Sequence, residues 1–188
     1  MADASWVGSF RAMAYNNAWA NHRLLTACLA LSDTAFVAPR VGFFPSIAAT
    51  LNHIYIVDWF YVDGLEAGWL GRAAFENRIP FPAATTLLGA QAEMDRRLIA
   101  VCDGLTEADL AGEARFNRGV RVQVERRDRV LLHLFQHQIH HRGQAHAMLS
   151  ATSVEPPQLD EFYSTAEAPT RAGEFAALGF TEAMVWRG

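Results

Sequence analysis

The stretch HQIHHRGQ, residues 137–144, is the most informative part of this sequence. It places His137 and His141 four residues apart in a segment with a helical pattern. In an α-helix this spacing is about 400° of rotation and about 6 Å of rise, so both imidazoles leave the same face. Two neutral imidazoles on one face supply half of a zinc-like site, and a third ligand from another helix would complete an open one. The motif therefore predicts a further metal ligand elsewhere in the chain.

Four long helices are predicted around this motif. Apolar residues recur at spacings of three and four from Trp6 to Leu31, which is typical of an amphipathic helix. A second helix begins at Ser46, a good N-cap residue, and runs to about Ala67; it is apolar on most sides and should be largely buried. A third runs from about Thr85 to Cys102, and the fourth, Arg127 to Ser150, carries the histidines.

The connections between these helices complete the predicted architecture. Residues 114–125 alternate apolar and polar side chains around Asn117–Gly119, which predicts a short hairpin or an extended crossover. Loops rich in Gly and Pro are expected at 39–45 and 68–82, and a short last helix from about Gly173 to Met184. No repeat or linker interrupts the chain. The sequence thus predicts one all-α domain over 1–188: a four-helix bundle with a long crossover between helices 3 and 4 and a short C-terminal helix.

Composition narrows the class of protein. The 188 residues are 51% hydrophobic and 19% charged, with a net charge of −4, as expected for one soluble globular domain. All basic groups are arginines, and they are scattered, which argues against a nucleic-acid surface and excludes lysine chemistry. No signal peptide or membrane-length apolar run is seen, so a cytoplasmic protein without membrane contact is expected. Cys28 and Cys102 are predicted to be buried thiols in a reducing compartment.

The clustering of histidines favours a metal site over packing alone. Five of the seven histidines fall between His133 and His146. His137 and His141 share a helical stripe with Val130 and Met148, so their face should point inward. Histidines that only pack and hydrogen-bond in the core remain the alternative interpretation.

His53 is the candidate for the third ligand. A lone histidine in an apolar helix is usually a core residue whose hydrogen bonds are satisfied. Beside a His137–His141 pair in the same bundle, however, it becomes the best partner for a shared cation. Three histidines leave coordination positions open for water or substrate, whereas a structural site is normally closed by a fourth protein ligand.

The other histidines receive different predictions. His133 is expected beside the site or on its substrate side, with plain solvation as the alternative. His140 is expected to orient a neighbour or to make a packed polar contact. His22 and His146 are predicted to be surface or interhelical residues. Competing motifs are absent: the chain has no HExxH, no paired ExxH, no glycine-rich phosphate loop and no Ser or Cys nucleophile motif.

At this point the chain resembles the DinB-like (DinB/YfiT) metalloenzyme family over nearly its whole length. The resemblance rests on ANHRLL at 20–25, LNHIYIVDW at 51–59, HLFQHQIHHRGQ at 133–144, and Pro156, Pro157, Leu159, Asp160 and Tyr163. It implies a bundle that is commonly dimeric and that holds a divalent metal, typically nickel or zinc, with three histidines. Transferred by motif, these ligands are His53, His137 and His141.

The resemblance also implies a choice of functions. Relatives include transferases and isomerases that use a low-molecular-weight thiol, so a metal-dependent enzyme is expected that activates a thiol or a water at the open position of the ion. No catalytic residue can be assigned. The alternative function is a non-enzymatic, metal-binding stress-response protein with a structural site. A homodimer is expected, with the apolar first and third helices as candidate interfaces.

Three further roles are predicted near the motif. Arg142 could pair with a carboxylate such as Asp58 or reach another element. Gly143 could permit close helix packing. The aromatic residues near His53 could line an apolar pocket, although core packing explains them as well: Tyr55, Trp59 and Tyr61.

Overall fold

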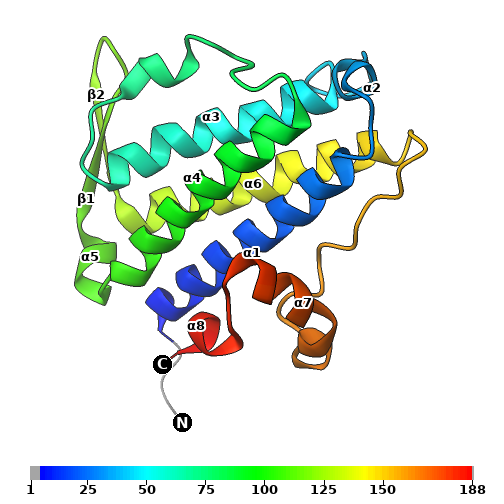
Figure 1. Cartoon of the computed structure of the whole chain (residues 1–188). Helices are drawn as coiled ribbons and strands as arrows, with labels where there is room; N and C mark the ends of the chain where they lie inside the picture. Colours follow the sequence, from blue (N-terminus) through cyan, green and yellow to red (C-terminus); the bar gives the residue numbers. More distant parts are fainter. Residues whose placement is uncertain (1–4, 188) are drawn as a thin grey trace.

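Four long helices lie side by side in a bundle (Figure 1). The computed structural model describes residues 5–187. The bundle helices are α1 (Trp6–Cys28), α3 (Ile47–Leu65), α4 (Ala84–Gly104) and α6 (Arg127–Leu149). Helix α1 packs mainly on α4, and α3 packs mainly on α6. The predicted all-α four-helix bundle is confirmed, with α3 starting directly after its N-cap Ser46, whose hydroxyl accepts a hydrogen bond from the Ala49 N–H at 3.0 Å.

The crossover between α4 and α6 contains a hairpin at one end of the bundle (Figure 1). Its strands are antiparallel, with Glu113 opposite Arg126, so of the two predicted alternatives the hairpin is correct. Two short helices, α2 and α5, were not predicted, and each begins at a hydroxyl N-cap, Ser32 and Thr106 respectively. The bounds of these shorter elements are α2 (Asp33–Val37), η1 (Gly71–Phe75), α5 (Glu107–Ala111), β1 (Glu113–Asn117) and β2 (Val122–Arg126).

The C-terminal segment differs from the prediction. A single helix from Gly173 to Met184 is wrong, because the segment forms η2 (Thr165–Glu167), α7 (Ala168–Leu178) and α8 (Glu182–Trp186). Gly179 separates the last two helices with a φ of 73°, a left-handed conformation that ends helices and favours glycine. The first helix also ends earlier than predicted, at Cys28.

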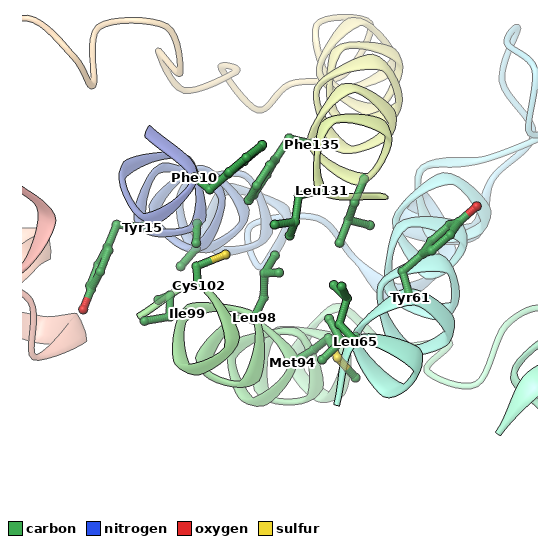
Figure 2. Packing of buried hydrophobic residues seen from close by; sticks show 14 of the residues in the cluster. Phe10, Tyr15, Tyr61, Leu65, Met94, Leu98, Ile99, Cys102, Leu131 and Phe135 are labelled. Atoms are coloured by element: carbon green, nitrogen blue, oxygen red, sulfur yellow. The ribbon is translucent and has the colours of Figure 1, made fainter. Parts of the chain in front are cut away.

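The bundle interior is filled by large apolar side chains from all four helices. Leu131 of α6 points toward Leu98 of α4, and Phe135 of α6 lies beside Phe10 of α1, as Figure 2 shows. Cys28 and Cys102 are fully buried free thiols, as predicted, and burial raises the pKa of both. Within residues 5–187, no helix is both long and apolar enough to cross a bilayer.

Candidate metal centre

The three predicted ligands meet between α3 and α6. The two helices run antiparallel. The Arg127 guanidinium at the start of α6 donates to the Leu65 carbonyl at the end of α3 at 3.0 Å, which shows that the start of one helix lies beside the end of the other. His53 of α3 therefore faces the same turns of α6 that carry His137 and His141. All three side chains offer a ring nitrogen, and these nitrogens lie within 4.8 Å of one another.

The imidazoles converge through their ring nitrogens. His53 Nε2 lies 2.9 Å from His137 Nε2, and the ring centroid of His141 lies 4.6 Å from that of His53 and 4.4 Å from that of His137. His137 Nδ1 is buried without a hydrogen-bond partner in the described part of the chain. An ion that holds two imidazole nitrogens at about 2.0–2.1 Å places them about 3 Å apart. The observed spacing therefore fits a shared cation.

The environment keeps the imidazoles neutral. Burial, with a smaller contribution from His141, lowers the pKa of His53 to about 4. Burial and the neighbouring histidines lower the pKa of His137 to about 3, and burial also lowers that of His141. Only the neutral ring offers a lone pair to a metal, so the cluster is ready to bind a cation at neutral pH.

Gln144 fixes the orientation of His141. His141 Nδ1 donates a hydrogen bond to Gln144 Oε1 at 2.8 Å, which leaves Nε2 as the free nitrogen. The Gln144 amide in turn donates to His140 Nε2 at 3.1 Å. No role was predicted for Gln144, although its position three residues after His141 in a helix is a signal for such a contact.

A cavity of about 450 Å³ borders His53. The ring of Phe44 lies 4.3 Å from that of His53 and 5.5 Å from that of His141, measured between centroids. The loop that carries Phe44 is closed by a hydrogen bond from the Arg40 N–H to the Pro45 carbonyl at 2.8 Å. The cavity is lined by Phe44, Pro45, Ala49, His53, Ile56, Phe75, Arg78 and Ile79.

The aromatic residues that were predicted as alternative pocket walls do not line this cavity. Tyr61 packs against Phe60 and Phe116, and Tyr55 packs edge-on against Phe81. Core packing is therefore the correct interpretation for both residues. The aromatic walls are instead Phe44 and Phe75 of η1, and residues of α3 and of the segment after η1 contribute to the rest of the lining.

The remaining histidines lie outside the three-histidine cluster. His133 is exposed and packs against the Tyr61 ring, with centroids 5.3 Å apart. His146 Nε2 lies 3.0 Å from the Pro157 carbonyl and joins α6 to the C-terminal segment, while His22 is half-buried on α1.

The predictions for the HHRGQ motif have different outcomes. Of the two alternatives for Arg142, the pair with Asp58 is wrong and the contact with another element is confirmed: the guanidinium donates to the side-chain oxygens of Asn17 and of Asn21 on α1, the latter at 2.9 Å. Gly143 does not mediate close packing, because it is exposed and a Cβ there would meet no atom of the described residues within 4 Å.

Arg142 belongs to a buried polar network that draws on all four bundle helices. The Asn17 and Asn21 amides donate to Asp95 at 3.1 and 2.9 Å. The Gln91 amide joins Asp95 at 3.1 Å to Asp58 at 2.9 Å. The network lies beside the histidines, since Arg142 directly follows His141 on α6.

Comparison with known proteins identifies the family to which this architecture belongs. A crystal structure of a DinB-like protein from Bacillus cereus matches with a TM-score of 0.60 and 16% sequence identity, over 77% of this chain and 91% of that chain. At this identity the likeness concerns the fold alone. No curated protein matches the chain. The model of the DinB family matches residues 7–172, and the chain therefore belongs to the DinB family.

Proposed function

We propose that this protein is a metal-dependent enzyme in which His53, His137 and His141 bind one divalent ion, nickel or zinc. The observation that carries the proposal is the convergence of three ring nitrogens within 4.8 Å, on two rigid helices, in an environment that keeps them neutral. Nickel and zinc both accept imidazole ligands.

A divalent ion at this place would lower the pKa of a thiol or a water at its open position. The three histidines hold the ion and supply no charge of their own. Gln144 fixes the ring of His141, and Phe44 shields the site by packing against His53 and His141. Thiol-dependent group transfer and hydrolysis by an activated water are both compatible with this arrangement.

A structural site is the second candidate, and two observations weigh against it. The cluster of possible ligands among residues 5–187 has three members, whereas structural zinc sites normally have four. His53 also borders a cavity large enough for a small molecule. Both features favour a site with an open position.

The metal content of purified protein tests the metal assignment. We expect elemental analysis of untagged protein to give about one nickel or zinc ion per chain, lost in His53→Ala and in His137→Ala. His146→Ala, which removes a histidine from the same helix outside the cluster, should keep the ion. Equal metal content in the wild type and both cluster variants would contradict the proposal.

A spectroscopic titration separates an open from a closed site. Addition of a small thiol to the nickel-loaded protein should produce a sulfur-to-nickel charge-transfer band with one thiol per ion. A loaded protein that gives no such band, and whose melting temperature falls strongly on chelation, would instead identify a structural site.

A further inference from the structure

The cavity beside His53 has an unusual distribution of charge. Six of its eight lining side chains are apolar, Pro45 and Ala49 included, and its aromatic walls come from Phe44 and Phe75. His53 lies at the boundary with the candidate metal centre. Among the other seven lining residues, Arg78 is the one with a charged side chain.

Arg78 has no partner within the part of the chain that the structure describes. Its guanidinium makes no hydrogen bond, and no carboxylate lies within 4.0 Å of it. Several other arginines are engaged, for example Arg97 with Glu66 and Arg171 with Glu182. Arg78 is exposed to solvent, and it offers hydrogen-bond donors without a protein partner and a positive charge at the wall of an apolar cavity.

We propose that the cavity binds an elongated apolar carboxylate, with its hydrocarbon part against the apolar walls and its anionic end on Arg78. The apolar walls offer few partners for polar groups, so a strongly polar ligand would lose hydrogen bonds to water without replacement. A carboxylate beside a guanidinium, in contrast, gains a charge-assisted hydrogen bond. The volume of about 450 Å³ lies in the range of small-molecule sites.

This assignment specifies the substrate class of the proposed enzyme. It rests on the proposed function only for the reacting end of the ligand, which would meet the open position of the ion at the His53 side of the cavity. Binding of the apolar chain and of the carboxylate requires no metal, so the two ideas can be tested separately.

The first experiment measures binding to metal-free protein by calorimetry. We expect octanoate to bind about tenfold more tightly than octanol, and octyltrimethylammonium to bind more weakly than either, because Arg78 attracts an anion and repels a cation. Each methylene added between butanoate and octanoate should tighten binding about fourfold until the cavity is filled. Equal affinities for octanoate and octanol would overturn the assignment of Arg78.

Variants locate the binding site. Arg78→Ala should weaken octanoate about tenfold and leave octanol unchanged. Arg72→Ala removes the same charge from the same segment, outside the cavity lining, and should leave both unchanged. Ala49→Leu places bulk in the cavity one turn before His53 and should weaken both ligands. Octanoate binding that is the same in Arg78→Ala and Ala49→Leu as in the wild type would overturn the proposal, and Arg78→Ala alone decides if Ala49→Leu fails to fold.

A mercaptoalkanoate series joins the two ends in the nickel-loaded protein. A thiol at one end should give the sulfur-to-nickel band, while the carboxylate at the other end tightens binding at an optimal chain length. In Arg78→Ala the band should remain and the gain from the carboxylate should disappear. If the protein binds no metal but its affinity for octanoate still depends on Arg78, the proposed function fails and the ligand class stands. If the protein binds the metal but its affinity for octanoate does not depend on Arg78, the ligand class alone is rejected.

Discussion

Gln144 is the residue through which the support of a ligand in the candidate metal centre can be tested. Because it accepts the hydrogen bond of His141 Nδ1 at 2.8 Å, Gln144→Ala frees that ring to rotate. Loss of such a partner costs about 10- to 100-fold in metal affinity, and we expect a decrease of this size in competition titrations with a chromogenic chelator. Gln136→Ala changes an exposed glutamine of the same helix and should have no effect. Equal affinity in Gln144→Ala and the wild type would show that the bond does not support the ligand.

Asp95 should impose a pH dependence on stability. Burial raises its pKa from 3.8 to about 6, so the folded protein favours the neutral acid. The resulting contribution to stability is present below about pH 4 and is lost as the pH rises through 6. A shift of this size corresponds to on the order of 2–3 kcal/mol.

The variant Asp95→Asn isolates this contribution. The histidines act with opposite sign, because the lowered pKa values of His53 and His137 destabilise the fold as the pH falls below 6.5. The free energy of unfolding in urea, compared between metal-free wild type and metal-free Asp95→Asn from pH 4 to 7, separates the two effects. The stability of the wild type relative to the variant should fall over this range. A difference that does not change with pH would contradict the raised pKa of Asp95.

At the scale of elements, Gly64 controls how α3 meets the hairpin. A Cβ at this position would lie 2.3 Å from Phe116 Cε1 of β1. Gly64→Ala should therefore lower the free energy of unfolding by about 1–3 kcal/mol. Gly89→Ala, inside α4 with no atom within 4 Å of the new Cβ, should raise it by up to about 1 kcal/mol. Chemical denaturation of the two variants checks both signs, and two equal effects would rule out the steric explanation.

The elements that sequence periodicity predicted are the ones with several turns. Apolar residues recur at spacings of three and four through the first helix, and the four long helices with one long connection predicted the bundle. The short helices α2 and α5 each have only one turn and one N-cap residue as a sequence signal. The break at Gly179 is the conformation of a single residue, which apolar periodicity over several residues does not detect.

The same distinction applies to the candidate site. His137 and His141 could be predicted because the helix relates them by geometry, and His53 because it is the histidine of a buried neighbouring helix. Phe44 and Arg78 reach the cavity from irregular segments, whose paths are set by tertiary contacts. The partners of Arg142 could not be predicted either, because they depend on the rotation of α1 relative to α6.

At the scale of the whole molecule, a single buried network ties the four helices together. Asp95 and Asp58 raise the pKa of the nearby Arg142 guanidinium, whereas burial lowers it. The effect of burial is larger, and the pKa of Arg142 falls to about 10. Burial and Asp95 raise the pKa of Asp58 well above its ordinary value. Neutral amides of Asn17 and Asn21 lie between the guanidinium and Asp95, so the charges interact through hydrogen-bonded side chains.

Removal of Arg142 should therefore destabilise the whole bundle. Arg142→Met keeps the length and apolar stem of the side chain but leaves the oxygens of Asn17 and Asn21 without a donor and Asp95 without a nearby cation. Breaking a buried charge network in this way costs about 3–5 kcal/mol, measurable as a lower urea midpoint at pH 7. Arg129→Met changes an exposed arginine at the start of the same helix and should cost less than about 1 kcal/mol.

The coupling between Arg142 and Asp95 decides whether this loss is electrostatic. If the unpaired carboxylate causes it, the double variant Arg142→Met, Asp95→Asn should recover part of the stability that Arg142→Met loses, because no buried charge then remains on Asp95. A loss that is the sum of the two single losses would mean that the residues act independently. The loss in Arg142→Met would then come from the side-chain oxygens of Asn17 and Asn21, which lose their donor, and not from the charge of Asp95.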